Sequence, residues 1–175
     1  MRSAIFWVVM TGAMAMVSNW QTVAATGPRA SLILPKADRV VVLKSERRMI
    51  LMRDEQILKV YPVSLGRYPK GRKQFEGDAR TPEGVYLLDF KIENSHFYRA
   101  IRINYPNAQD IARARAIGKA PGGRIMIHGL PNKMSAERVG HSSIDWTQGC
   151  IAVTNGQMDE IWKMVDAGTP IEIRP

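Results

Sequence analysis

The chain has 175 residues, of which 45% are hydrophobic and 23% charged, a balance typical of one globular domain. Its formal charge of +9 would suit an anionic polymer or surface, but the basic residues are spread along the chain and no nucleic-acid-binding motif accompanies them. The single cysteine excludes an internal disulfide.

The N-terminal 25 residues predict a signal peptide. Arg2 supplies a positive charge, and the uncharged apolar run 4–17 is shorter than the roughly 20 residues that a membrane-spanning helix needs. Small residues end the segment at Ala25, where we expect cleavage. An uncleaved membrane anchor is the alternative. Under either interpretation the domain lies outside the cytoplasm, in the periplasm or cell envelope.

Residues 26–37 are interpreted as a linker, and residues 38–175 as one catalytic domain. Short β-prone runs separated by turns predict antiparallel hairpins, with a polar loop over 66–79. The predicted strands cover residues 39–44, 48–53, 56–65, 85–90, 100–104, 124–128 and 169–174.

Two helices are expected between the later strands. The first covers 107–118, with Asn107 as its N-cap. The second begins at a capping box of Thr154 and Gln157 and ends at Gly168. Its apolar face consists of Met158, Ile161, Trp162 and Val165. The predicted fold class is mainly β, with two or three short helices.

Cys150 is the first candidate catalytic residue. The preceding Gly149 would allow close approach of a substrate, and the amides of these two residues could form an oxyanion hole. The alternative is an inert buried thiol, since a free cysteine is among the most buried residue types. The segment alone does not distinguish these two interpretations.

Histidines could supply the base that a cysteine nucleophile needs. His128 ends an apolar strand, and a nearby imidazole can lower the pKa of a thiol by several units. The alternative for His128 is a structural role at a strand end. His141 lies in a polar loop nine positions before Cys150 and could orient the base or bind substrate. His96 is interpreted as structural or peripheral.

Metal binding is the competing use of the same side chains. His128, His141 and Cys150 could in principle hold zinc, but their spacing matches no metal-binding motif. We therefore expect neither a metal nor another cofactor. A serine nucleophile elbow and a phosphate-binding loop are also absent from the sequence.

An ordered set of motifs resembles the L,D-transpeptidase (YkuD) catalytic domain family over about residues 38–174. The signature is His128-Gly129, a variable loop, and then Thr147-x-Gly149-Cys150-Ile151. Three further stretches are similar to the family: GDARTPEGVY at 77–86, FY at 97–98 followed by INYPN at 103–107, and GTPI at 168–171.

The resemblance implies a mixed β-sheet sandwich with the active site at one end. Cys150 would attack the amide after the third residue of a peptidoglycan stem peptide, and His128 would be the base, oriented by a carbonyl near Gly129. The thioester would then react with an acceptor amine, giving a cross-link or a lipoprotein tether, or with water. The implied substrate-binding and oxyanion residues are Gly149, Thr147, His141, Gly129, Gln148, Trp146 and Tyr105.

Two positions depart from the family pattern. Gln148 stands where the family often has histidine, and Ala152 stands where it often has arginine or asparagine. An arginine there could hold a substrate carboxylate, which alanine cannot do. A hydrolase acting on the same bonds, including a wall–lipoprotein link, is therefore kept as an alternative. A domain that binds the cell wall without catalysis is a second alternative.

Overall fold

The computed structural model of the protein describes residues 34–175. The expected signal peptide, 1–25, and most of the expected linker, 26–37, lie outside the described residues. Within the part that is described, no helix is long and apolar enough to cross a membrane.

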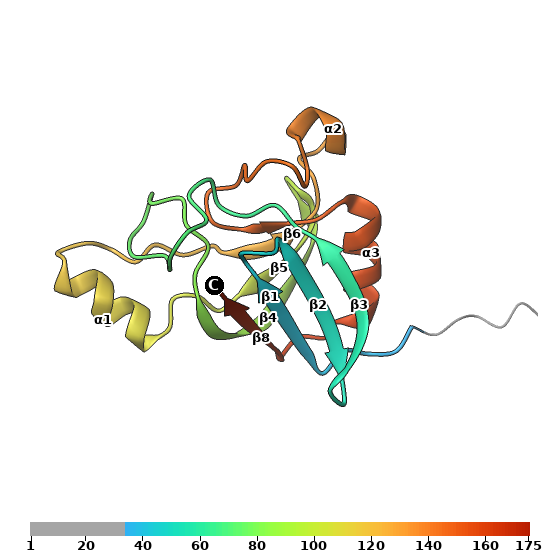
Figure 1. The fold of residues 1–175 in the computed structure, drawn as a ribbon, viewed down its shortest axis with the longest axis horizontal. Helices are drawn as coiled ribbons and strands as arrows, with labels where there is room; N and C mark the ends of the chain where they lie inside the picture. The colour runs from blue at the N-terminus through green and yellow to red at the C-terminus, as the bar shows by residue number, and fades with distance from the viewer. Residues whose placement is uncertain (1–33) are drawn as a thin grey trace, which may run out of the picture. The chain divides into compact units, whose positions relative to one another are not determined.

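Eight strands form one curled sheet, and three helices lie around it (Figure 1). The strand order in the sheet is β3-β2-β1-β8-β4-β5-β6-β7. The strands are β1 Arg39–Leu43, β2 Arg48–Arg53, β3 Gln56–Pro62, β4 Gly84–Ser95, β5 Tyr98–Ile103, β6 Met126–His128, β7 Ile151–Ala152 and β8 Thr169–Arg174. The helices are α1 Ala108–Ala116, α2 Ala136–Val139 and α3 Asn155–Met164.

The two outermost strands of this order are joined to each other through the chain that follows β3. The backbone N–H of Ser64 donates to the carbonyl of Ala152 at 3.0 Å, and the N–H of Ala152 donates back to Ser64 at 2.8 Å. A second bridge joins Gly66 to Thr147. The curled sheet is thereby closed into a ring, and β7 lies at the closure.

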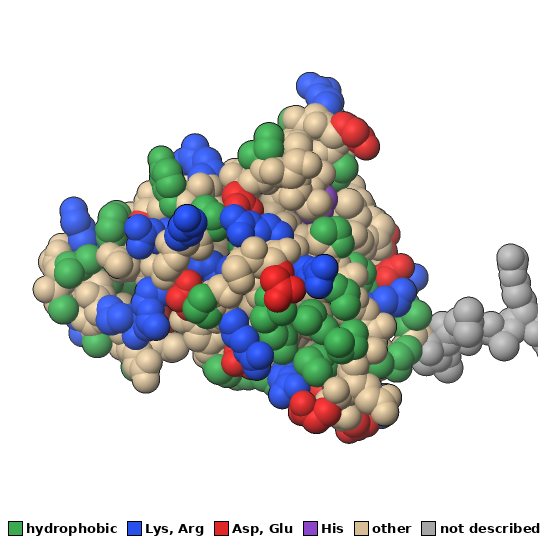
Figure 2. Space-filling view, viewed as in Figure 1, with side chains coloured by type: hydrophobic (Ala, Val, Ile, Leu, Met, Phe, Trp, Pro, Cys, Tyr) green, Lys and Arg blue, Asp and Glu red, His purple; other side chains and the backbone are tan. Residues whose placement is uncertain are grey.

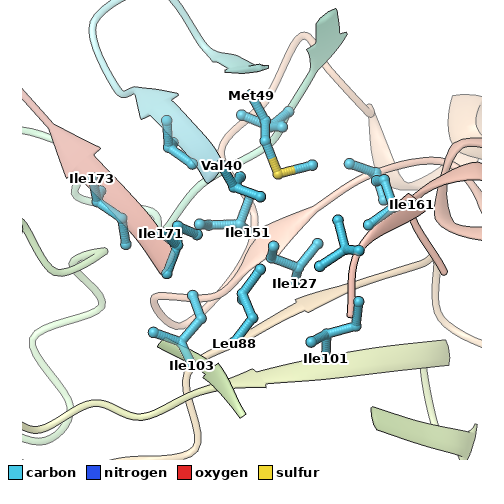
Figure 3. Packing of buried hydrophobic residues seen from close by; sticks show 14 of the residues in the cluster. Val40, Met49, Leu88, Ile101, Ile103, Ile127, Ile151, Ile161, Ile171 and Ile173 are labelled. Carbon is cyan, nitrogen blue, oxygen red and sulfur yellow. The ribbon is translucent and has the colours of Figure 1, made fainter. Parts of the chain in front are cut away.

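Alternating side chains of the strands point into one hydrophobic core, which α3 covers with Met158, Ile161 and Met164. Burying one such side chain stabilises the fold by about 1.5–3 kcal/mol relative to leaving it exposed. Figure 3 shows the centre of this core, formed by Val40, Met49, Leu88, Ile101, Ile103, Ile127, Ile151, Ile161, Ile171 and Ile173.

The prediction of a mainly β fold is confirmed, as are both helix caps. Asn107 accepts from the backbone of Asp110 at 3.0 Å, and Thr154 accepts from that of Gln157 at 3.3 Å. The helix α3 ends earlier than predicted, because Val165 already has an extended backbone and Gly168 comes after the helix.

Several element boundaries differ from the sequence prediction for identifiable reasons. The strand β4 runs to Ser95 because its first half pairs with β8 and its second half with β5. The strand β6 begins only at Met126, since Arg124 has a positive φ of 53° that breaks an extended strand. The third strand was predicted to cover 56–65 but ends at Pro62, and Ser64 forms an isolated bridge instead. The strand β7 and the helix α2 were not predicted.

The surface in Figure 2 carries Lys and Arg side chains in several places, with Asp and Glu among them. Many of these charges are paired on the outer face of the sheet. Arg39 pairs with Glu55 at 2.8 Å, and Arg174 pairs with Glu172 at 2.7 Å. Exposed pairs of this kind contribute little to stability, at most about 1 kcal/mol each.

Candidate active site

The parallel pairing of β6 with β7 places His128 and Cys150 on the same face of the sheet. Ile127 pairs with Ile151, and both point into the core (Figure 3). Because side chains alternate along a strand, His128 and Cys150, each next to one of these isoleucines, point to the opposite face. The structure thus brings together two residues that are 22 positions apart in the sequence.

A cleft of about 680 Å³ contains both side chains. Its walls come from the end of β4 with the turn after it, from β6 with the segment before it, and from the loop before β7. Trp146, Thr147 and Gln148, three of the predicted substrate-binding residues, also line this cleft.

The ring of His128 is oriented by the residue that follows it. Its Nδ1 lies 2.7 Å from the carbonyl oxygen of Gly129. A carbonyl only accepts hydrogen bonds, so Nδ1 carries the proton and Nε2 keeps a free lone pair. Gly129 is itself held, because its N–H donates to the carbonyl of Arg99 at 3.1 Å. His128 is therefore present in the tautomer that a general base at Nε2 requires.

Aromatic side chains enclose the imidazole of His128, which is only 4% exposed. The ring centre of Phe97 lies 4.5 Å from that of His128, and the ring of Trp146 lies 5.7 Å away in an edge-on orientation. Burial lowers the pKa of His128 to about 4, although the Gly129 carbonyl raises it, and His141 lowers it further. The imidazole is therefore neutral at neutral pH.

The thiol of Cys150 is half-buried, and its hydrogen bond goes to the carbonyl of Arg124, with 3.5 Å between the sulfur and the oxygen. Burial raises the pKa of this thiol, while the backbone N–H of Met126 and the positive charge of Lys73 act in the opposite direction. The expected lowering of the thiol pKa by an imidazole is thus not found. The cleft therefore holds a neutral thiol and a neutral imidazole at rest.

The turn before Cys150 is shaped by Thr147 and Gly149. The Thr147 hydroxyl accepts from the N–H of Gly149 at 3.0 Å and donates to the carbonyl of Cys150 at 2.8 Å. Gly149 has a φ of +127°, and a Cβ there would lie 2.6 Å from the carbonyl oxygen of Arg80. The amide of Gly149 is therefore already engaged, which leaves the Cys150 amide as the donor for a developing oxyanion.

Four of the seven predicted substrate-binding and oxyanion residues are not among those that line this cleft: Gly129, Gly149, His141 and Tyr105. The Nδ1 atom of His141 is 3.2 Å from the hydroxyl of Ser64, whose backbone pairs with Ala152. The hydroxyl of Tyr105 donates to the carbonyl of Pro121 at 3.1 Å, and its ring packs edge-on against Tyr86. Substrate contact by His141 and Tyr105 stays a prediction.

The end of β4 and the turn that follows it supply cleft residues that were not predicted from the sequence. Asn94, Ser95, His96 and Phe97 all line the cleft, whereas His96 was interpreted as peripheral. The signal that could have identified them is the aromatic pair Phe97-Tyr98 directly after a polar turn. In the structure Phe97 packs on His128.

A metal site of at least three ligands is not formed by the residues described. No group of three or more His, Cys, Asp or Glu side chains within 34–175 could hold an ion. The chemistry available in the cleft is that of a thiol, a neutral imidazole and backbone amides, which together suit acyl transfer.

Comparison with known proteins gives a consistent result across the domain. Residues 37–173 match the model of a family described as the L,D-transpeptidase catalytic domain, YkuD. YafK of Escherichia coli K12, which is named as a candidate L,D-transpeptidase, is 33% identical over 132 residues, or 72% of this chain. The chain spans about half the length of this curated relative, 46% of it.

Solved structures share the fold. Pgp2 from Campylobacter jejuni, described as a helical cell shape determining protein, matches with a TM-score of 0.57 and 27% identity. The match covers 78% of this chain and 46% of Pgp2. An L,D-transpeptidase from Mycobacterium smegmatis matches with a TM-score of 0.53 and 15% identity over 78% of this chain and 58% of its own, a likeness of fold alone.

Proposed function

Because this chain belongs to the L,D-transpeptidase catalytic domain (YkuD) family, we propose that it is a peptidoglycan-modifying enzyme that transfers acyl groups through Cys150. The observation that carries the proposal is that Cys150 and His128 line one cleft, with Nε2 of His128 free to accept a proton. The donor is a stem peptide, cleaved at the amide after its third residue.

The first step forms the carbon–sulfur bond of a tetrahedral intermediate. The thiol rotates from the Arg124 carbonyl towards the imidazole, and Nε2 of His128 takes the proton as the sulfur attacks the amide carbon. Because both groups are neutral at rest, proton transfer and attack are coupled, and no ion pair has to be stored in the buried cleft. The hydrogen bond from Nδ1 to Gly129 then stabilises the imidazolium.

The second step expels the leaving amine. The backbone N–H of Cys150 stabilises the oxyanion of the tetrahedral intermediate. The carbon–nitrogen bond then breaks, the proton on Nε2 goes to the departing nitrogen, and the acyl group remains on Sγ. Thr147 holds the turn in place during this step through its contacts to Gly149 and Cys150.

The fate of the thioester separates two candidate activities. An acceptor amine gives a cross-linked or lipoprotein-tethered product, and water gives a trimmed peptide or a severed link. The hydrolytic alternative is supported by Ala152, which is fully buried and offers no charge to hold a substrate carboxylate. Transfer is the principal proposal because it is the activity for which the family is described.

The location proposed for the enzyme follows from its polymer substrate. Peptidoglycan lies outside the cytoplasm, so the domain works in the cell envelope, and in the periplasm if the N-terminal segment acts as a signal or anchor. The likeness to Pgp2, a protein described as determining helical cell shape, makes cell shape a trait to examine in a strain that lacks this protein.

The decisive experiment incubates the protein with a defined disaccharide tetrapeptide, with and without an amine acceptor. Mass spectrometry should detect an acyl group on the wild type that is absent from Cys150→Ala. Dimers would support transfer, and free tripeptide alone would support hydrolysis. A carbapenem, whose strained ring acylates nucleophilic thiols, gives an independent label of Cys150.

The non-catalytic alternative makes the opposite prediction. A domain that only binds the wall would retain peptidoglycan in a pull-down, would release no product from tetrapeptide or whole sacculi, and would form no covalent adduct. That combination of results would overturn the enzymatic proposal.

A further inference from the structure

Arg124 occupies an unusual position beside the nucleophile. It precedes β6, and its carbonyl oxygen lies 3.5 Å from Sγ of Cys150. Its backbone has a φ of +53°, the left-handed region in which residues other than glycine are uncommon. The residue is exposed and belongs to the lining of the catalytic cleft.

Among the described residues that line this cleft, Arg124 carries the only permanent positive charge. The other lining residues are neutral or histidine, and no Asp or Glu is among them. Within residues 34–175, the structure gives the Arg124 guanidinium no carboxylate partner, so its charge is available to a ligand in the cleft. A basic side chain in a cleft without Asp or Glu favours binding of an anionic substrate.

Backbone conformation alone does not favour arginine at this position. Glycine adopts a positive φ without steric cost, and a non-glycine residue there stores strain of the kind that clusters at functional sites. Gly122 and Gly123 directly precede Arg124, so the tight turn already has its flexible residues. The backbone conformation therefore gives no reason for an arginine at this position, whereas the charge of Arg124 and its place in the cleft do.

We infer that Arg124 binds a carboxylate of the stem peptide within one residue of the scissile amide and sets the donor specificity of the enzyme. The inference rests on the proposed function. One residue of extended peptide covers about 3.5 Å, so a side chain of arginine length that starts beside Sγ reaches the neighbouring carboxylates. A guanidinium binds a carboxylate through two parallel hydrogen bonds. Ala152 cannot do this.

Two carboxylates of the donor lie within that reach. One belongs to the terminal residue that is released, and the other to the side chain of the third residue, which stays on the enzyme. The chemistry of recognition is the same for both. Donor peptides with either carboxylate converted to an amide distinguish the two sources.

The test compares Arg124→Gly and Arg124→Lys with the wild type on the acid donor and on the two amidated donors. Lys133→Gly is the matched control, because Lys133 is an exposed basic residue with a φ of +67° that does not line the cleft. Both glycine variants remove one positive charge and relieve one left-handed backbone, so neither should lower Tm.

The expected result for Arg124→Gly is a rise in KM for the acid donor of about tenfold or more, with kcat within about threefold. On one of the two amidated donors, Arg124→Gly and the wild type should perform equally, which identifies the carboxylate. Arg124→Lys should recover part of the affinity, and Lys133→Gly should behave like the wild type.

Binding measurements in the Cys150→Ala background separate this inference from the proposed function. Calorimetry compares Cys150→Ala with Cys150→Ala/Arg124→Gly on the acid and amide peptides, independently of turnover. If the wild-type protein shows no turnover, the result counts against the proposed enzymatic function. The ratio of the affinities for the acid and amide peptides would still decide the role of Arg124. An acid-to-amide affinity ratio that is unchanged by Arg124→Gly would overturn the inference.

Discussion

The carbonyl oxygen of Gly129 accepts a hydrogen bond from Nδ1 of His128 at 2.7 Å, and this contact determines which ring nitrogen can act as a base. The backbone of Gly129 is held by the hydrogen bond from its N–H to the carbonyl of Arg99, and its surroundings leave no room for a side chain. A Cβ at Gly129 would lie 2.7 Å from Oδ1 of Asn155 and 2.9 Å from Cβ of Tyr98. The carbonyl of Gly129 thereby selects the tautomer of His128, the residue proposed as the base.

Replacing Gly129 with alanine should therefore damage activity more than stability. We expect Gly129→Ala to cost about 1–3 kcal/mol through overpacking and to lower kcat/KM at least about tenfold through displacement of the His128 ring. Urea unfolding and donor turnover measure the two effects. Gly156→Ala is the control, because nothing lies within 4 Å of the added Cβ in α3, and it should stabilise the helix by up to about 1 kcal/mol. Full activity in Gly129→Ala would contradict this role.

The buried imidazole of His128 should make the protein sensitive to mild acid. Its pKa is about 4 in the fold and near 6.5 when unfolded, so between these values the unfolded state binds a proton that the folded state does not. Stability is unaffected by this group above pH 6.5 and falls as the pH drops towards 4. Between pH 7 and 4.5 the loss should be about 2 kcal/mol.

Denaturant unfolding at these two pH values measures that loss. In His128→Gln the difference between pH 7 and 4.5 should shrink by about 2 kcal/mol, while the remaining part reflects other titrating groups, among them His141 and Glu160, whose pKa values are also lowered in the fold. An identical pH dependence in the variant would show that His128 is not the group responsible.

The hydroxyl of Thr147 should be needed for the geometry of the Cys150 turn. Thr147→Val keeps the shape of the side chain but removes the bonds to the Gly149 amide and the Cys150 carbonyl, which are 3.0 and 2.8 Å long. Because Thr147 is only 4% exposed, the loss should be about 1–3 kcal/mol, accompanied by a fall in kcat. Thr147→Ser retains the hydroxyl and should recover most of both. Equal kcat values for the two variants would argue against the hydrogen bonds.

The positive charge of Lys73 should keep the thiol of Cys150 more acidic than burial alone would leave it. Lys73 is buried and pairs with Asp78 at 2.8 Å. We expect Lys73→Met to cost about 3 kcal/mol and to raise the pKa of Cys150, which iodoacetamide labelling across a pH range would detect.

A second buried pair of the domain provides the matched control for Lys73→Met. Lys44 pairs with Glu83 at 2.8 Å, and its charge is not among the causes of the Cys150 shift. Lys44→Met should destabilise the fold to a similar extent while leaving the labelling profile of Cys150 in place. A shift of equal size in both variants would indicate a general loosening of the fold rather than an electrostatic effect.

Local patterns in the sequence predict much of this fold. Short β-prone runs separated by turns identify β1, β2 and β8, and capping residues identify both longer helices, because these signals act within a few positions of the chain. The strand β7 has only two residues, Ile151–Ala152, and exists because β6 and Ser64 pair with it. A strand formed by such distant partners carries no local pattern of its own.

The candidate site likewise has features that the sequence predicts and features that only the folded chain determines. Cys150 and His128 stand out by residue type and motif, but their meeting depends on the register of β6 with β7, which no local pattern specifies. The role of the turn at 94–97 depends on how far β4 extends, and that length comes from its change of partner from β8 to β5. The neutral state of the thiol depends on burial, which only the assembled cleft reveals.

The closure between Ser64 and Ala152 has a consequence for how the proposed activity should be lost on heating. The proposed nucleophile, Cys150, lies one residue before β7, where the ends of the sheet are joined by two mutual backbone bonds. Short pairings at such an end are the first to fray on heating. On heating, activity should therefore be lost before the circular dichroism signal, and residual activity would report thermal damage earlier than the spectrum does.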